Sequence, residues 1–444
     1  MALFDSLAIS GKRGMRGARR FGIPAYVLIL AVCSSPAPSS QAQGYVAASP
    51  WVATWGTAMV DAGSAGSPDL TQATLRMIVH TSIGGPQVRV WLSNRFGTVP
   101  LHIEAAHLAL STVANPDSKT DLTAIKPDTD RALTFDHLTS VTIPPGATVV
   151  SDGVSLHVPA LADIAVSLYF PEQTLGSTMH GGANQLSFAM SGNLVSAPGL
   201  PANSWSRGSW YFLTGVDVYA PGKSAVVAFG DSITDGNHST QNANRRWPDY
   251  LAARLAADES TCKAGVLGVV NTGISGNRVL LDGDGPSALS RLSWDVLERS
   301  GVRYLILFHG INDIESYTRY RQPYADLEQR LEAGLTQIAT QAHDHGILVI
   351  GATQMTDCRN FQCTWPEGEV VRTALNQWIR TANVFDGLID FDLVTRDPEH
   401  PTQLLPQYNS GDFVHPNDAG YQAMANAIDL KLLTITATPQ PATK

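Results

Sequence analysis

The stretch Ser224-Ala225-Val226-Val227-Ala228-Phe229-Gly230-Asp231-Ser232 decides the fold. Its apolar run shows no polar alternation, which is typical of a strand that is buried on both faces of a parallel sheet. The turn that follows ends the strand and places a serine hydroxyl at its carboxyl end. Because ligands of open parallel sheets bind beyond the carboxyl ends of the strands, this stretch predicts an α/β fold with a site at Ser232.

The same strand pattern returns further along the chain. Apolar runs occur at Val266–Val270, Tyr304–Phe308, Ile347–Gly351 and Phe385–Phe391. Three amphipathic helix patterns are marked by Leu327, Leu331, Leu335, Ile338 and Ala342, by Val371, Leu375, Trp378 and Ile379, and by Tyr421, Met424, Ile428 and Leu432. Buried strands that alternate with such helices predict a three-layer α/β/α parallel sheet over residues 223–435.

Residues 43–220 have a different pattern. Apolar and polar residues alternate in Gln87–Leu92, Val154–Val158 and Ala165–Phe170, as in strands with one buried face. Glycine- and proline-containing turns separate these runs. We therefore expect an all-β, sandwich or jelly-roll-like domain ahead of the α/β domain.

The first 42 residues have the order of a secretory signal peptide. A basic stretch leads into the apolar run Phe21–Val32, and a small-residue site follows at residues 40–42. The run is shorter than the ~20 apolar residues that a spanning helix needs, so we expect export to a secreted or periplasmic location and no membrane span. A lipoprotein site at Cys33 is the alternative. Residues 436–444 are expected to form a loose tail.

Composition and cysteine usage narrow the classes of function. Hydrophobic residues make up 44% of the chain and charged residues 16%, which excludes a disordered chain. The net charge of −9 argues against a nucleic-acid partner. Cys358 and Cys363 fit a small disulfide loop, with zinc binding as the alternative, and Cys262 is left as an odd thiol.

Polar residues gather in four blocks at the expected strand ends and before the last helix. The blocks are Gly230–Gly236, Asn271–Asn277, His309–Asp313 and Asp412–Asn417. Ser232 is the candidate nucleophile, His415 its base and Asp412 the carboxylate that orients the base. The Ser232 N–H, the Gly276 N–H and the Asn312 amide are the candidate donors to a tetrahedral oxyanion. Together they predict nucleophilic acyl transfer without a metal or an organic cofactor.

These four blocks, in this order, resemble the GDSL esterase/lipase family, also called SGNH hydrolases. The resemblance covers about residues 223–435, and the preceding β region makes the chain similar to a two-domain secreted subgroup. It implies the flavodoxin-like SGNH-hydrolase fold, with the five residues named above in the roles given there. The expected substrate is a small-molecule or polysaccharide ester, above all a carbohydrate acetyl ester. Short-chain or lipid esters are one alternative and an inactive glycan-binding protein is another; the oligomeric state stays open.

The other residues of the blocks are expected to be structural. Asp231 is expected to hold local backbone N–H groups, and Asp235 and Asp313 to be loop or cap residues. His309 is expected to be a packed histidine rather than a substrate contact. Gly273 is expected to serve the turn, which leaves the oxyanion role to Gly276.

Overall fold

The structure is a computed structural model that describes residues 49–63, 67–112, 121–258, 267–319, 326–357 and 366–434. The predicted signal peptide, the tail, and Cys33, Cys262, Cys358 and Cys363 lie outside the described residues. Among the described residues, no helix combines the length and apolar character that crossing a membrane requires.

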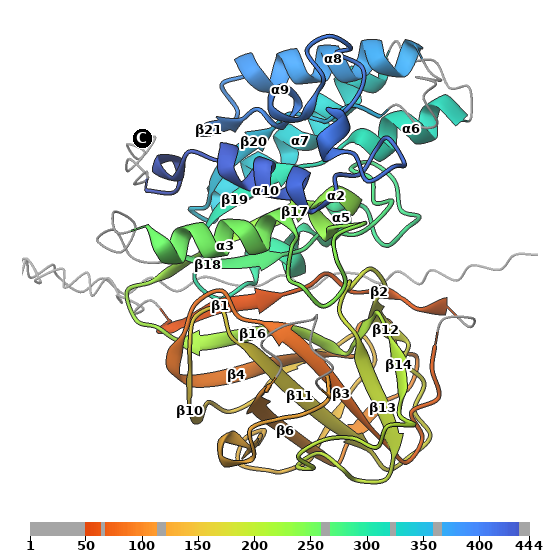
Figure 1. Ribbon diagram of the computed structural model, residues 1–444, viewed down its shortest axis with the longest axis vertical. Helices are drawn as coiled ribbons and strands as arrows, with labels where there is room; N and C mark the ends of the chain where they lie inside the picture. Colours follow the sequence, from red (N-terminus) through yellow and green to blue (C-terminus); the bar gives the residue numbers. More distant parts are fainter. Residues whose placement is uncertain are drawn as a thin grey trace, which may run out of the picture. The chain divides into compact units, whose positions relative to one another are not determined.

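A five-stranded parallel sheet organises the C-terminal half (Figure 1). Its strands are β17 (Ser224–Gly230), β18 (Leu267–Asn271), β19 (Val302–Phe308), β20 (Leu348–Ala352) and β21 (Gly387–Ile389). They lie in the order β18-β17-β19-β20-β21, and every neighbouring pair is parallel. This order is that of the flavodoxin-like fold class that the sequence predicts. The strand order reverses direction between β17 and β19, which is where such sheets bind ligands.

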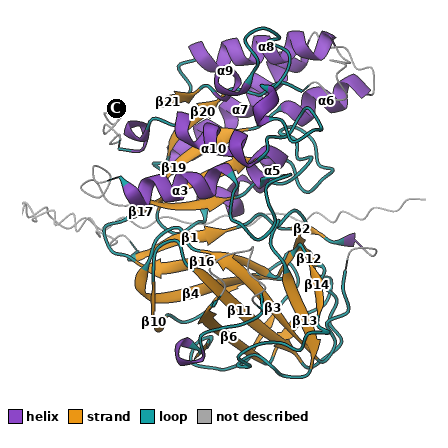
Figure 2. Ribbon diagram, viewed as in Figure 1, coloured by secondary structure: helices purple, strands orange, loops and turns teal. Residues whose placement is uncertain are grey.

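Helices cover both faces of this sheet (Figure 2). They are α2 (Ser232–Asp235), α3 (Trp247–Ala257), α5 (Ala288–Leu292), α6 (Ile311–Arg319), α7 (Leu327–Asp344), α8 (Pro366–Thr381), α9 (Phe391–Thr395) and α10 (Asp418–Ala427). Ala225 and Val227 of β17 pack in one apolar cluster with α5, α7 and α8. Val226 and Ala228, which point the opposite way, pack in another with α3, α9 and α10. The predicted α/β/α layers are confirmed.

The strands described between Trp51 and Tyr219 pair in an antiparallel manner. One sheet joins β1 (Trp51–Gly56), β16 (Leu213–Tyr219), β4 (Gly85–Ser93) and β10 (Val154–Val158), with β9 (Thr148–Val150) also on β4. A second joins β14 (Trp205–Arg207), β13 (Ser187–Ser191), β3 (Ala73–His80), β11 (Asp163–Phe170), β6 (Ala105–Leu110) and β7 (Arg131–Ala132). Val88 and Val90 of β4 share one core with Leu75 and Met77 of β3, so the two sheets form a sandwich.

Two small sheets complete the antiparallel region. They consist of β15 (Trp210–Tyr211), β12 (Thr178–His180) and β2 (Val60–Asp61), and of β5 (Leu101–Ile103) with β8 (Val141–Ile143). The three-stranded sheet matters for function, because β12 carries a histidine that contacts the α/β region.

The antiparallel and parallel regions pack against each other directly. Ala53 of β1 donates its N–H to the Ser300 carbonyl at 2.9 Å, and Val52 belongs to the same apolar cluster as Val227. The described residues between 49 and 434 accordingly form one packed unit. The predicted division into residues 43–220 and 223–435 as separate domains stays a prediction.

The last helix is shorter than its apolar pattern predicts. Helix α10 ends at Ala427, Ile428 is already extended, and Leu432 lies in a separate 3-10 turn at Leu430–Leu433. The Asp429 carboxylate accepts the Lys431 N–H at 3.0 Å, so a new cap interrupts the helix while both apolar side chains still pack inward.

Candidate active site

Ser232 begins α2 at the carboxyl end of β17 and is 7% exposed. Asp231 caps this short helix, because its carboxylate accepts the Ile233 N–H at 3.1 Å. The expected backbone-holding role of Asp231 is therefore confirmed. Its carboxyl is fully buried, and burial raises the pKa of Asp231 to about 7.

The structure brings Ser232, His415 and Asp412 into one line of hydrogen bonds. His415 Nε2 lies 2.8 Å from Ser232 Oγ, and His415 Nδ1 lies 2.5 Å from Asp412 Oδ2. The carboxylate accepts the Nδ1 proton, so the Nε2 lone pair faces the serine hydroxyl. This arrangement lets the imidazole take the serine proton when the oxygen attacks an electrophile.

Asp412 is held in place by the loop that carries His415. Its Oδ1 accepts N–H groups from His415 at 2.8 Å and Val414 at 3.0 Å, and the Ser410 hydroxyl at 3.1 Å. Partial burial alone would raise the pKa of Asp412, but the His415 ring and these N–H groups outweigh it and hold the pKa well below its usual range. The carboxylate is thus charged at neutral pH and stabilises an imidazolium.

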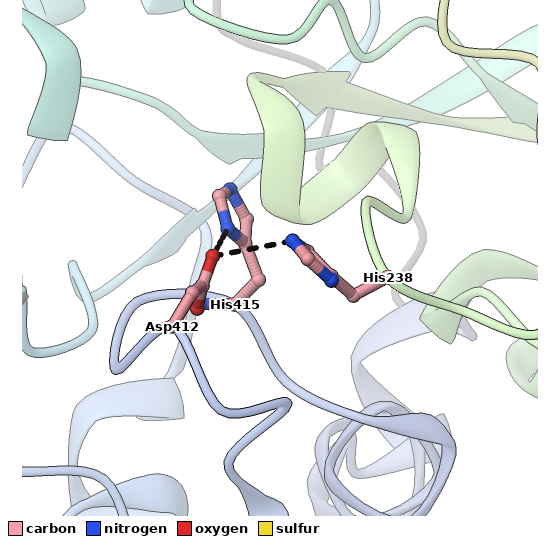
Figure 3. Close-up of side chains that lie close together, drawn as sticks. All are labelled: His238, Asp412 and His415. Carbon is pink, nitrogen blue, oxygen red and sulfur yellow. Dashed lines mark hydrogen bonds and ion pairs between the residues drawn. The ribbon is translucent and has the colours of Figure 1, made fainter.

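A second histidine, which the sequence did not single out, lies beside this pair. The His238 ring stacks on the His415 ring with centroids 5.4 Å apart, and its Nε2 lies 3.3 Å from Asp412 Oδ2 (Figure 3). The ligand atoms of the three side chains lie within 4.8 Å of one another, as a metal site would need. A metal there would have to displace the proton that lies between His415 and Asp412. That the site works without a metal remains a prediction.

The two other candidate oxyanion residues lie on a loop and at the start of α6, and these two segments are hydrogen-bonded to each other. Gly276 has a φ of +77°, and a Cβ at that position would collide with the Asp284 carboxylate, so both conformation and space favour glycine. Asn312, near the start of α6, is buried and donates from Nδ2 to the carbonyl of Asn277 at 3.0 Å. The amide that would bind an oxyanion is therefore fixed to the residue next to Gly276.

Asp313 has a larger role than the loop or cap position expected for it. Its two carboxylate oxygens accept the N–H groups of Val279 at 2.8 Å and Leu280 at 3.0 Å. Burial raises the pKa of Asp313 to about 6, although both of these hydrogen bonds act in the opposite direction. Asp313 ties α6 to the loop that follows Gly276, so it is a structural residue as expected, with partners outside its own helix.

A buried arginine joins the strand ends beneath the site. Arg291 donates to the carbonyls of Gly230 at 2.8 Å and Thr272 at 2.7 Å, and to Asn277 Oδ1 at 3.0 Å. His309, fully buried as predicted, contacts the same Oδ1 at 3.1 Å. Burial and the nearby Arg291 charge lower the pKa of His309 well below its usual value, so this ring is neutral and structural.

The comparisons with known proteins concern the α/β region. The model of the GDSL-like lipase/acylhydrolase family matches residues 226–428, a little under half of the chain. No curated protein matches.

Solved structures with a similar fold include three esterases. An aryl esterase from M. smegmatis is 18% identical over 46% of this chain and 95% of its own, with a TM-score of 0.35. A carbohydrate acetylesterase from Sinorhizobium meliloti is 16% identical over 46% and 96%, with a TM-score of 0.34. An acetyl xylan esterase variant from Geobacillus stearothermophilus is 21% identical over 49% and 100%, with a TM-score of 0.35. The family match spans most of the parallel sheet and the loops around Ser232, so this part of the chain is similar to the GDSL-like lipase/acylhydrolase family.

Proposed function

We propose that the protein is a serine ester hydrolase that works through an acyl-enzyme. The observation that carries this proposal is the relay from Ser232 Oγ to His415 Nε2 at 2.8 Å and from His415 Nδ1 to Asp412 Oδ2 at 2.5 Å. Ser232 attacks the ester carbonyl carbon while its proton passes to His415, and His415 then protonates the leaving alcohol. Water, activated by the same imidazole, releases the carboxylic acid and restores the serine.

Three donors are assigned to the oxygen that becomes negative in this reaction. They are the backbone N–H of Ser232, the backbone N–H of Gly276 and the amide of Asn312, whose other N–H is bonded to the Asn277 carbonyl. Donors that are fixed before the substrate arrives stabilise the tetrahedral oxyanion without further reorganisation. No organic cofactor or metal takes part in this scheme.

For the substrate we propose an acetyl ester of a carbohydrate. The rim beside the nucleophile is polar, since the His238 side chain is 48% exposed and that of Asp412 33% exposed. Such a rim suits a hydrated leaving alcohol better than a long alkyl chain. The signal-peptide pattern of residues 1–42 supports an exported enzyme, which would meet polysaccharides outside the cytoplasm.

The test is a substrate panel with the wild type and Ser232→Ala. We expect acetate release from p-nitrophenyl acetate and from acetylated xylan, and no turnover by the variant. Preference for long-chain p-nitrophenyl esters over acetate would instead favour a lipase. Binding to the polysaccharide with no turnover of any ester would favour an inactive glycan-binding protein.

A further inference from the structure

A buried histidine of the antiparallel region contacts the short helix α2, which begins with Ser232. His180, the last residue of β12, is 3% exposed and stacks on Trp210 with ring centroids 5.6 Å apart. Its Nδ1 lies 2.8 Å from the Ala58 carbonyl and its Nε2 lies 2.8 Å from Asp235 Oδ1. Both ring nitrogens are thus hydrogen-bonded, Nδ1 to the antiparallel region and Nε2 to the α/β region.

Asp235 passes this contact on to the oxyanion loop. It is the last residue of α2, three positions after Ser232, and is 4% exposed. Its second oxygen, Oδ2, accepts the Ser275 N–H at 3.1 Å and the Ser275 hydroxyl at 2.8 Å. Ser275 directly precedes Gly276, so one carboxylate connects the nucleophile helix, the oxyanion loop and the antiparallel region.

Two glycines let the surrounding backbone close around Asp235. A Cβ at Gly182, two residues after His180, would collide with the Asp235 carboxylate, and a Cβ at Gly273 would collide with the Asp235 backbone. Neither glycine needs a left-handed conformation, so close approach is the reason for its small size. Asp235 is therefore a structural residue, as expected, but its partners lie outside its own helix.

The hydrogen positions follow from the acceptors. The Ala58 carbonyl can only accept, so His180 Nδ1 carries a proton. The proton between Nε2 and Asp235 makes the pair either an imidazolium with a carboxylate or two neutral groups. Burial alone would lower the pKa of His180, but the Asp235 charge and the two hydrogen bonds outweigh it and raise the pKa above its usual value.

We propose that His180 and Asp235 are positioning residues that hold the Ser275–Gly276 backbone where its N–H can bind the oxyanion. The antiparallel region is then part of the catalytic unit and not only a separate binding module. This inference rests on the proposed function, because it concerns the oxyanion donor at Gly276. Loss of one oxyanion donor costs roughly 10²–10³ in kcat, and the loss of position should approach that range.

Two substitutions at Asp235 distinguish the effect of positioning Ser275 from the effect of the Asp235 negative charge. In Asp235→Asn the amide oxygen can keep both bonds from Ser275, while the amide N–H donates to Nε2 of a neutral His180 that still donates from Nδ1 to Ala58. In Asp235→Ala the Ser275 and His180 donors lose their acceptor. We expect Asp235→Asn to keep kcat for p-nitrophenyl acetate within about fivefold, and Asp235→Ala to lose about 100-fold or more with little change in KM.

His180→Phe removes the link while keeping a ring against Trp210. Asp235 keeps its bonds from Ser275 but loses its own partner, so kcat should fall, by less than in Asp235→Ala. The matched control is His107→Phe, which removes another histidine–aspartate pair, His107 with Asp130 at 2.9 Å, wholly within the antiparallel region. The control should leave kcat unchanged. If His180→Phe does not fold, the two Asp235 variants decide the matter alone.

Hydrogen exchange supplies a readout that needs no activity. Peptides covering residues 273–280 should exchange faster in Asp235→Ala than in Asp235→Asn or the wild type, since the Ser275 N–H has lost its acceptor. An active wild type whose kcat and exchange are unchanged in Asp235→Ala would overturn the inference. So would an Asp235→Asn variant as slow as Asp235→Ala, because charge and not position would then be what matters. A wild type without turnover would instead refute the proposed function.

Discussion

Replacing Asp412 by asparagine tests the relay most sharply, because the loop leaves the new amide little choice of orientation. Asp412 Oδ1 accepts three donors: the N–H groups of His415 and Val414 and the Ser410 hydroxyl. In Asp412→Asn the amide oxygen keeps those bonds only if the NH₂ group takes the place of Oδ2. The opposite orientation would set two backbone N–H groups against an amide donor, at a cost of about 1–3 kcal/mol for each unsatisfied group.

The favoured orientation places an N–H donor opposite His415 Nδ1, which lies 2.5 Å from Oδ2 in the wild type. The imidazole must then accept at Nδ1 and carry its proton at Nε2, where it faces the hydroxyl of Ser232 at 2.8 Å. A protonated Nε2 cannot accept the serine proton. The corresponding change in serine proteases lowers kcat by about 10⁴, or about 5 kcal/mol in the barrier, and we expect a loss of that order.

The assay is kcat and KM for p-nitrophenyl acetate across pH, with thermal melts of the same samples. The matched control is Asp418→Asn, at the start of α10, whose carboxylate bonds Thr240 and Arg245 and not the relay. It should shift the melting temperature slightly and leave kcat unchanged. If Asp412→Asn melts lower but keeps near-normal kcat, Asp412 is only a structural residue and the base is a Ser–His dyad.

Two further predictions concern neighbouring residues. Asn312→Ala should lower kcat by roughly 10²–10³ with little change in KM, because one oxyanion donor is lost; an effect confined to KM would make Asn312 a substrate-binding residue. Asp231, whose pKa burial raises to about 7, binds a proton in the folded protein that the unfolded chain loses above its ordinary value of 3.8. The free energy of unfolding of the wild type therefore falls as pH rises from about 4 to about 7. Asp231→Asn keeps the cap but cannot ionise. Its free energy of unfolding should rise relative to that of the wild type by up to about 4 kcal/mol over that range. Denaturant unfolding at pH 5 and pH 8 measures this, and an equal difference at the two pH values would contradict it.

The parallel sheet and the contact between Asp412 and His415 were predictable because the signals are local. A buried strand such as β17 needs a continuous apolar run. The turn at the carboxyl end of this strand carries Ser232. Asp412 and His415 are three residues apart, so their pairing could be predicted without knowing the fold. The boundary of α10 was missed because an apolar spacing persists through Leu432, while the break at Ile428 depends on the competing cap of Asp429.

The supporting residues were not predictable, because their partners lie far away in the chain. Asp313 bonds backbone groups 33 and 34 positions away, and His180 bonds Asp235 across 55 positions. In the sequence an aspartate that anchors a distant loop looks the same as one that caps its own helix. Arg291 likewise resembles any helical arginine, although it binds the ends of two strands.

The central claim is that Ser232 is a nucleophile activated by His415. The most direct measurement is reaction of the wild type with a fluorophosphonate ester, followed by peptide mapping by mass spectrometry. We predict a single covalent adduct on Ser232, formed at a rate that falls by several orders of magnitude in His415→Ala. An adduct on another serine, or equal labelling of Ser232 with and without His415, would contradict the account.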